Sequence, residues 1–273
     1  MKKMIKRFFN LIGSLLGLGI LNNIYNLLVF KEFSLRMKDH KNPINKTRFF
    51  GFSQSEEDGI ILEIMDRIKL KNGYFVEFGV GDGLENNTII LLASEWSGAW
   101  FGGQNLAFNT KHSKKLLFNK VWITKDNIVQ LYKSLNKDAD LISLDLDGND
   151  IYLVEKLLSD SIARPKVFIV EYNGKFPPNI KFRIDYDDKH SWNKNDYFGA
   201  SLLSFYEVFN KHGYRLVCCN LSGANAFFVL NEYAENFSDI PTEIGDLYSE
   251  PFYFIRNKKM HPTSPKTLEK LIR

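Results

Sequence analysis

The sequence predicts an α/β fold built on a doubly wound, mostly parallel sheet of seven strands, preceded by an N-terminal helical extension. Short apolar runs alternate with segments of helical spacing, which is typical of parallel strands covered by helices on both faces. Residues 74–83 read as a buried strand followed by a glycine-rich turn. Near the C-terminus, residues 220–225 separate two apolar runs. A connection this short favours an antiparallel hairpin, because a parallel crossover needs about a dozen residues or more.

Length and composition place the chain among ordinary globular proteins. Its 273 residues fit one large domain, or one domain with an appendage, and 44% hydrophobic residues suffice for a packed core. The net charge is only +4, and the basic residues are scattered outside the termini, so we expect no nucleic-acid partner. Cys218 and Cys219 are neighbours on a predicted strand, where side chains point to opposite faces. We therefore expect no disulfide and a reducing, cytoplasmic location.

Residues 1–31 are predicted to form an amphipathic helical extension. Residues 8–30 contain no charged residue and follow four basic residues between positions 2 and 7. On two short helices joined by a glycine hinge at 17–19, the apolar residues share one face of each helix. Five Asn or Ser residues within 8–30 would be costly in a bilayer core. We expect a peripheral contact with the inner face of the membrane; packing on protein and a true span are the alternatives.

The rest of the chain divides into a linker, a main domain and a tail. Residues 32–50 are charged and contain Asn42-Pro43, so we assign them to a linker. Residues 51–232 form the main domain, and residues 233–273 a C-terminal tail that packs on it. The predicted strands are 74–78, 99–101, 121–124, 141–144, 167–170, 215–219 and 226–230. The predicted helices are 55–68 (with Ser55 as N-cap), 86–94, 127–135, 152–158 and 201–212.

The glycine-rich turn is the most informative motif. Residues 77–83 read Glu-Phe-Gly-Val-Gly-Asp-Gly, with glycine at every second position after an acidic residue. Glycine lets backbone N–H groups approach a ligand closely, and the helix that follows adds a positive dipole end. The dinucleotide fingerprint G-x-G-x-x-G places its third glycine one position later. We interpret the turn as the site of a nucleotide-type cofactor; a tight turn without a ligand is the alternative.

Several segments together resemble the FkbM-type branch of the S-adenosylmethionine-dependent methyltransferases. These segments are Ser-Gln-Ser-Glu-Glu-Asp-Gly at 53–59, the strand and turn at 75–83, Asp-Leu-Ile-Ser-Leu-Asp-Leu-Asp-Gly-Asn-Asp at 140–150, Val-Glu-Tyr-Asn at 170–173 and Gly-Ala-Ser-Leu at 199–202. The resemblance covers about residues 53–230. It implies the sheet of the class I methyltransferases, S-adenosylmethionine as cofactor, and a sugar hydroxyl of a surface polysaccharide or glycolipid as acceptor. The cofactor contacts that it implies are Glu77, Gly79, Gly81, Asp82 and Gly83.

One departure from the family pattern concerns the end of the second strand. In such methyltransferases an acidic residue there binds both ribose hydroxyls, whereas residues 100–104 of this chain read Trp-Phe-Gly-Gly-Gln. Gln104 becomes the expected cofactor contact, although a neutral amide is a weaker acceptor than a carboxylate. Two alternatives to an active enzyme therefore stay open. One is a catalytically inactive methyltransferase-like binding or scaffold protein, and the other is a different nucleotide-binding α/β enzyme.

Acidic residues follow two of the predicted strands, where an open parallel sheet places its ligands. Asp145, Asp147 and Glu171 are the expected catalytic residues, as bases for the proton of an acceptor hydroxyl, and Asp145 is also an expected cofactor contact. Because oxygen ligands suit a hard cation, Asp147, Glu171 and Asn173 are candidate ligands of Mg²⁺. A turn that caps the following helix would also explain residues 147–150, and the two interpretations are compatible.

The polar and aromatic segment 185–197 is expected to close over the acceptor. It contains His190, a second candidate base. Trp192 and Tyr197 could stack on a sugar ring, although aromatic residues more commonly anchor such loops. The acceptor expected here is therefore a carbohydrate or a glycolipid.

Overall fold

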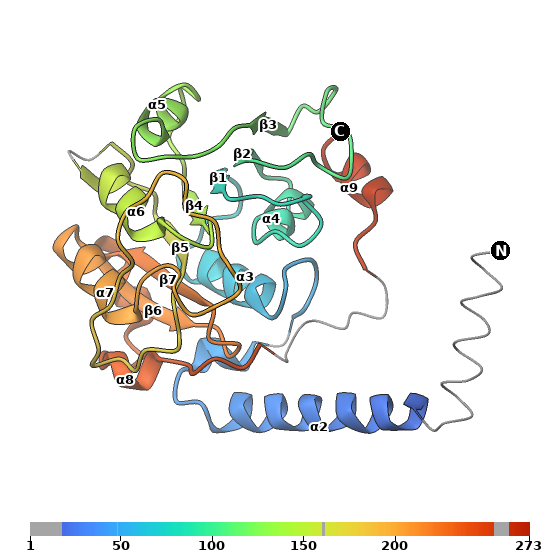
Figure 1. Ribbon diagram of the computed structural model, residues 1–273, viewed down its shortest axis with the longest axis vertical. Helices are drawn as coiled ribbons and strands as arrows, with labels where there is room; N and C mark the ends of the chain where they lie inside the picture. Colours follow the sequence, from blue (N-terminus) through green and yellow to red (C-terminus); the bar gives the residue numbers. More distant parts are fainter. Residues whose placement is uncertain (1–17, 48, 160–161, 254–261) are drawn as a thin grey trace. The chain divides into compact units, whose positions relative to one another are not determined.

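The computed structural model describes residues 18–47, 49–159, 162–253 and 262–273 (Figure 1). The chain forms two compact units, Met1–Asp39 and His40–Arg273. The first of the two predicted N-terminal helices falls within residues 1–17 and lies outside the described residues. The limits of the linker and the main domain stay predictions.

The described part of the N-terminal unit is one helix, α2 (Leu18–Asp39). It continues through residues 32–39, which were expected in the linker, because Lys, Glu, Arg and Leu are strong helix formers. One turn apart, Arg36 Nε and Glu32 Oε1 lie 3.2 Å from each other. The apolar residues are spread around α2 instead of sharing one face, so the predicted one-sided pattern is wrong for this helix. Within the described residues, no helix combines the length and the apolar character that crossing a membrane requires.

The second unit is built on one seven-stranded sheet with the order β3-β2-β1-β4-β5-β7-β6. The strands are β1 (Tyr74–Phe78), β2 (Ser97–Gly102), β3 (Leu116–Lys120), β4 (Leu141–Leu144), β5 (Val167–Glu171), β6 (Tyr214–Cys219) and β7 (Asn225–Leu230). Strands β1 to β5 run parallel, and β7 is antiparallel to both β5 and β6. This confirms the predicted α/β fold, with five parallel strands closed by a hairpin. The strand order reverses between β1 and β4, the place where such sheets bind ligands.

Helices cover both faces of the sheet (Figure 1). The helices of this unit are η1 (Pro43–Lys46), α3 (Glu57–Arg67), α4 (Ile89–Ala93), α5 (Ile128–Lys133), α6 (Asp150–Leu158), α7 (Leu202–Lys211), η3 (Asn231–Phe237), α8 (Ile244–Leu247) and α9 (Pro265–Leu271). In Figure 1, α5, α6 and α7 form one layer, while α3 and α4 lie on the other side. All residues of β4 are buried, and in β5 only the last residue, Glu171, is partly exposed.

Two local predictions need correction. The third strand lies at 116–120 instead of 121–124, because β3 is an edge strand whose exposed face weakens the apolar pattern. Ile123, in the run that was predicted, is buried without belonging to a strand. Ser55 is not the N-cap of α3, since Glu56 holds that position and the Ser55 hydroxyl donates to Glu57 Oε1 at 2.9 Å. The predicted capping hydrogen bond is therefore absent, and the side chain of the N-cap residue forms no hydrogen bond with the first turn of α3.

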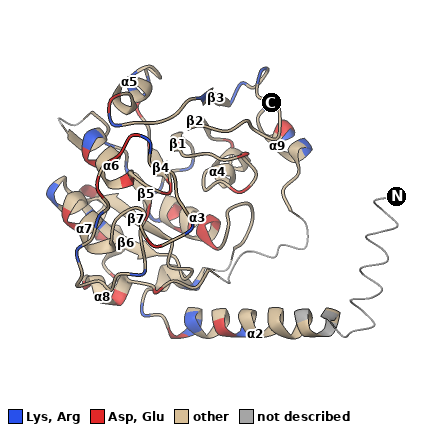
Figure 2. Cartoon of the chain, in the orientation of Figure 1, with Lys and Arg blue, Asp and Glu red and all other residues tan. Residues whose placement is uncertain are grey.

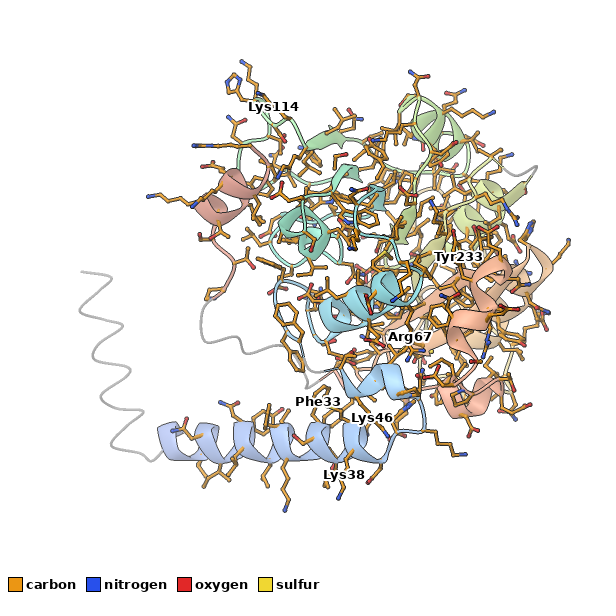
Figure 3. The ribbon with its side chains drawn as sticks, turned by 180° about the vertical axis from the view of Figure 1, so that it is seen from behind. Phe33, Lys38, Lys46, Arg67, Lys114 and Tyr233 are labelled. Atoms are coloured by element: carbon orange, nitrogen blue, oxygen red, sulfur yellow. The ribbon has the colours of Figure 1, made fainter. Side chains whose placement is uncertain are left out.

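The C-terminal tail packs on the sheet unit. Phe237, Leu247 and Leu268 are buried in the same apolar core as the strands. On α3, the guanidinium of Arg67 (labelled in Figure 3) forms two hydrogen bonds with the Asp239 carboxylate, at 2.6 and 3.0 Å. The tail therefore completes the unit that carries the site.

Candidate active site

The buried carboxylate of Glu77 fastens the glycine-rich turn to the end of β1. It accepts hydrogen bonds from Asn87 N at 3.1 Å, from Thr88 N at 3.2 Å and from the Thr88 hydroxyl at 2.5 Å. Trp100 Nε1 in turn donates to that hydroxyl at 2.8 Å. Burial raises the pKa of Glu77, and the three donors oppose that rise. Glu77 therefore shapes the turn that a ligand would meet.

The three glycines of the turn have different roles. Gly79 has a φ of +98°, and a Cβ atom there would stand 1.6 Å from the Asp145 carbonyl oxygen, so the chain tolerates no side chain. A Cβ atom at Gly83 would meet Leu106, Phe108 and Trp100 at 2.9–3.0 Å, so this glycine serves packing. Around Gly81 nothing lies within 4 Å of the added atom. The space beside Gly81 is thus open, as a ligand approaching the backbone would require.

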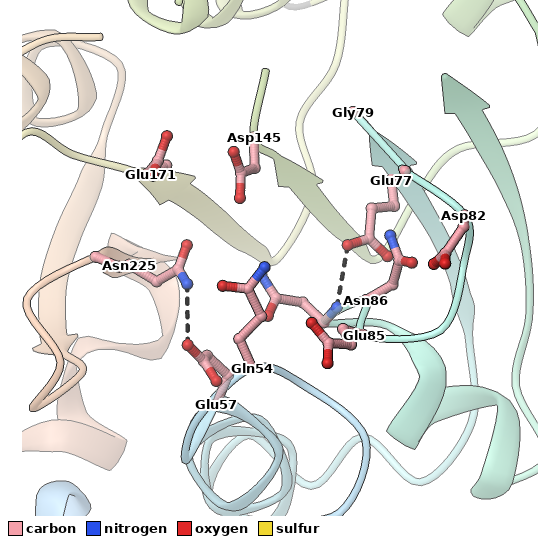
Figure 4. A pocket seen from close by; sticks show the side chains of 13 residues that line it. Gln54, Glu57, Glu77, Gly79, Asp82, Glu85, Asn86, Asp145, Glu171 and Asn225 are labelled. Carbon is pink, nitrogen blue, oxygen red and sulfur yellow. Dashed lines mark hydrogen bonds between the residues drawn. The ribbon is translucent and has the colours of Figure 1, made fainter. Parts of the chain in front are cut away.

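A pocket of about 170 Å³ opens beside the turn, at the carboxyl ends of the strands (Figure 4). Its walls come from the turn, from the segment before α3 and from the ends of β4, β5 and β7. The lining residues are Gln54, Glu57, Glu77, Gly79, Gly81, Asp82, Glu85, Asn86, Asn87, Asp145, Glu171, Ala224 and Asn225. Six of them are acidic, and none of these described residues is Lys, Arg or His. Lys and Arg are instead spread over the helices and loops (Figure 2).

Asp145, Asp147 and Glu171, the three predicted catalytic residues, lie together. One carboxylate oxygen of each falls within 4.8 Å of the others. Burial raises the pKa of Asp145 well above its ordinary value, and the charges of Asp147 and Asp150 add to that rise. Burial and the charge of Asp145 raise the pKa of Glu171 in the same direction. Such a cluster can hold a proton between carboxyl groups or bind a cation.

The set of candidate cation ligands differs from the prediction in one residue. Asp145 joins Asp147 and Glu171 in the cluster. The amide of Asn173 is engaged elsewhere, because Nδ2 donates to the carbonyls of Asp196 at 2.9 Å and Phe198 at 3.1 Å. Its Oδ1 atom accepts from Lys175 N at 3.2 Å. Asn173 thus anchors the loop after β5, and we do not retain it as a ligand.

Asp150, and not Asp147, carries the turn after β4. The Asp150 carboxylate accepts from Leu146 N and from Gly148 N, both at 2.8 Å, and burial raises its pKa to about 6. Asp147 occupies the left-handed region with a φ of +55°, and its side chain is exposed. The capping interpretation therefore applies to Asp150 and leaves Asp147 free to meet a ligand.

The loop after β5 reaches the same edge of the sheet. The ring of His190 lies against Gly148, where it would stand 2.5 Å from an added Cβ atom. Its Nε2 atom is buried and has no hydrogen-bond partner among the described residues. Trp122 Nε1, after β3, donates to the Asp188 carbonyl at 2.8 Å, which fixes the loop. Trp122 and Trp192 remain 56% and 42% exposed, so their rings are available to an acceptor.

Five of the seven predicted cofactor contacts line the pocket, and two do not. Glu77, Gly79, Gly81, Asp82 and Asp145 line the pocket, as the list above shows. Gly83 packs against the core, and Gln104 is exposed and outside the described residues that line the pocket.

Seven lining residues were not predicted from the sequence: Gln54, Glu57, Glu85, Asn86, Asn87, Ala224 and Asn225. For Glu57 the available signal was the run of three acidic residues at 56–58, and the structure shows that all three are buried. Asn225 gave no signal, because it opens a strand after a polar connection. Its place in the site depends on the pairing of β7 with β5.

The fold is similar to that of several solved methyltransferases. The methyltransferase domain of bacterial CtHen1-C shares 13% identity at a TM-score of 0.40, over 64% of this chain and 97% of that one. The O-methyltransferase from Bacillus cereus, in complex with SAH, shares 15% identity at a TM-score of 0.38, over 73% and 88%. MycE, from the mycinamycin pathway and in complex with Mg, SAH and mycinamycin VI, shares 10% identity at a TM-score of 0.34, over 62% and 44%.

The chain thus spans less than half the length of MycE. No family model matches the chain, and no curated protein matches it in sequence. At these TM-scores the likenesses identify neither a family nor an activity.

Proposed function

We propose that this protein is an S-adenosylmethionine-dependent methyltransferase that methylates a sugar hydroxyl. The observation that carries the proposal is the composition of the pocket lining. Six acidic residues line it beside the glycine turn, and none of its described lining residues is basic. A pocket with this lining offers no cationic side chain to pyrophosphate or phosphate, which argues against a dinucleotide or a sugar nucleotide. It favours a cofactor that carries a positive charge.

S-adenosylmethionine supplies a methyl group on a positively charged sulfur; transfer breaks the sulfur–carbon bond, returns its electron pair to sulfur and forms an oxygen–carbon bond. The chain's residues fit such a group. The open space at Gly81 lets the backbone meet it closely. Asp82 and Glu85 line the pocket beside the turn and offer carboxylate acceptors for ribose hydroxyls. These two carboxylates, on the segment after β1, would replace the ribose-binding carboxylate that is missing at the end of β2.

The carboxylate cluster would orient the acceptor hydroxyl and take up its proton. Asp145 and Glu171 line the pocket, and Asp147 lies beside them at the exposed side of the cluster. A positioned base typically contributes about 10²–10⁴-fold to a rate. The same oxygens would suit Mg²⁺, which could bind the acceptor and acidify its hydroxyl. In either case the proton leaves the acceptor at this cluster.

The exposed aromatic side chains support a carbohydrate acceptor. Trp122 and Trp192 stay half-exposed although each is fixed by its indole N–H, at 2.8 Å to Asp188 O and 2.6 Å to Asn195 O. Fixed, exposed rings present flat apolar faces of the kind on which sugar rings can stack. A sugar of a polysaccharide or glycolipid would combine such a face with hydroxyl groups.

A methyl-transfer assay tests the proposal. The protein is incubated with S-adenosylmethionine carrying a ¹³C methyl group and with a panel of bacterial polysaccharides and glycolipids. We expect a labelled methyl ether on a sugar and one equivalent of S-adenosylhomocysteine. Label on nitrogen, carbon or a carboxylate would refute the sugar acceptor. Tight cofactor binding without transfer to any acceptor of the panel would favour the inactive binding protein.

A further inference from the structure

Asn225 presents a buried oxygen without a partner at the β7 end of the acidic pocket. The residue opens β7, lines the pocket and is only 7% exposed. Its Oδ1 atom has no hydrogen-bond partner among the described residues. Buried polar groups are nearly always hydrogen-bonded, and an unpaired one is costly. A carbonyl oxygen left unpaired in a pocket wall indicates a donor that arrives with a ligand.

Glu57 sets the direction of that oxygen. Asn225 Nδ2 donates to Glu57 Oε1 at 3.1 Å (dashed in Figure 4). The same carboxylate receives Ser55 N and Asn220 Nδ2, each at 2.7 Å. Because all its partners are donors, Glu57 acts as an acceptor and holds the NH₂ end of Asn225. The oxygen of Asn225 must then face away from Glu57, and Figure 4 shows it on the side of Glu171.

The neighbouring strand places a carboxylate beside this oxygen. Glu171 and Asn225 are directly opposed on the antiparallel strands β5 and β7, so their side chains stand on one face. Glu171 belongs to the cluster with Asp145 and Asp147. Three oxygen-bearing side chains therefore line this part of the pocket: Asn225, Glu171 and Asp145. No described lining residue offers a cation to them.

We propose that Asn225 and Glu171 form a subsite for an ammonium group of the ligand, with Glu57 as the residue that positions Asn225. An ammonium group carries three donors and a positive charge, whereas a hydroxyl group offers one donor and no charge. It can donate to Asn225 Oδ1 and to the carboxyl group of Glu171, which stands opposite Asn225 on the neighbouring strand. The group anchors the ligand and is not the methyl acceptor, since a protonated amine has no lone pair.

The ammonium group has two conceivable sources. One is the amino-acid end of S-adenosylmethionine, and the other is an amino sugar that serves as acceptor. The identity of both ligands rests on the proposed function. The chemistry of the subsite does not rest on the proposed function, because it follows from the contacts of Asn225, Glu57 and Glu171.

Calorimetric titrations of the full chain distinguish the two sources. The first pair of probes is S-adenosylhomocysteine and its analogue without the α-amino group. The second pair is glucosamine and glucose, titrated with and without S-adenosylhomocysteine. For one of the pairs, we expect the amine to bind about tenfold or more tightly than its neutral partner, the range of a charge-assisted hydrogen bond. Which pair shows the preference identifies the source.

A variant of Asn225 then tests whether this residue causes the preference for the amine over its neutral partner. In Asn225→Ala the preference for the amine should fall to about threefold or less, because the oxygen that receives the ammonium group is removed. Asn119→Ala on β3, outside the pocket, is the matched control and should bind as the unchanged protein does. Thermal unfolding confirms that each variant is folded.

The proposal is overturned if the unchanged protein discriminates neither pair, or if the preference survives in a folded Asn225→Ala. An Asn225→Ala variant that lowers only the affinity for Mg²⁺ would reassign the residue to a cation site. Absence of any S-adenosylhomocysteine binding would contradict the proposed function instead, and the glucosamine pair without cofactor would still test the subsite.

Discussion

Gly79 approaches Asp145 so closely that a Cβ atom on Gly79 would stand 1.6 Å from the Asp145 carbonyl oxygen. This approach joins the two halves of the candidate site. Gly79 begins the turn after β1, and Asp145 begins the carboxylate cluster after β4, the two strands between which the sheet order reverses. The position of the turn and the position of the cluster therefore depend on one backbone contact.

Replacing Gly79 by alanine should disturb both parts of the site. The methyl group meets backbone, and the φ of +98° disfavours any L side chain, so we expect a loss of about 2 kcal/mol or more in the free energy of unfolding. Gly81→Ala is the matched control, because nothing lies within 4 Å of its Cβ position, and it should unfold like the unchanged protein. Urea denaturation of both variants measures the difference. Equal stabilities would mean that the contact is not as close as described.

A larger side chain at Gly81 should block the cofactor without harming the fold. Gly81→Val places a branched side chain in the open space beside the turn, where a ligand would lie against the backbone. We expect unchanged thermal unfolding together with a fall of at least about a hundredfold in affinity for S-adenosylhomocysteine. If a folded Gly81→Val binds as tightly as the unchanged protein, the cofactor does not use this turn.

Asp147→Asn should slow turnover and spare cofactor binding. Asp147 lies in the carboxylate cluster but outside the lining of the pocket, so the change removes one charge from the acceptor side. Loss of a base typically costs about 10²–10⁴-fold in rate. EDTA separates the two roles, since chelation abolishes activity only if a metal takes part. A variant that turns over at the unchanged rate would remove Asp147 from the mechanism.

The buried Glu56 should make stability fall as pH rises. Burial, and then the charge of Glu57, raise the pKa of Glu56 from 4.5 to about 7. The folded state then holds a proton that the unfolded chain releases, so the free energy of unfolding decreases between pH 4.5 and about 7.

Glu56→Gln should remove this part of the pH dependence. The decrease in the free energy of unfolding between pH 4.5 and neutral pH should then be smaller by up to about 3 kcal/mol. Its amide still offers an oxygen to Leu221 N. Exposed Glu235→Gln is the control and should leave the slope as it is. Denaturation at several pH values measures this slope. A free energy of unfolding that rises between pH 4.5 and about 7 would contradict a protonated Glu56 in the folded state.

The N-terminal unit should bind anionic membranes reversibly. Four basic residues lie between positions 2 and 7, and the exposed side chains of α2 include Leu27, Leu28 and Phe30. We expect the full chain to sediment with anionic vesicles at low salt and to dissociate at high salt. A chain that begins at His40 should stay in solution, because α2 ends at Asp39. Binding that resists both salt and carbonate would indicate a deeper insertion.

The sequence predicted best what depends on local pattern. Strands β1 and β4 were placed to the residue, because their apolar runs are short, continuous and bounded by polar groups. The gathering of Asp145, Asp147 and Glu171 followed from the rule that parallel strands end at one edge. Edge strand β3 was misplaced because its outer face is exposed.

The rest of the site depends on pairings between distant segments. Glu57 reaches the pocket because the segment before α3 contacts the connection between β6 and β7, as its 2.7 Å hydrogen bond from Asn220 Nδ2 shows. Asn225 faces Glu171 because β7 inserts between β5 and β6. No periodicity within either segment carries this information. The exclusion of Asn173 likewise required the positions of Asp196 and Phe198, more than twenty residues away.

The most direct measurement is a calorimetric titration of the full chain with S-adenosylhomocysteine and, in parallel, with NAD. The proposed function predicts saturable binding of S-adenosylhomocysteine at one site per chain, lost in Gly81→Val, and no measurable binding of NAD, whose pyrophosphate would enter a pocket lined by six acidic residues. Tight binding of NAD, or the absence of S-adenosylhomocysteine binding by the folded protein, would contradict it.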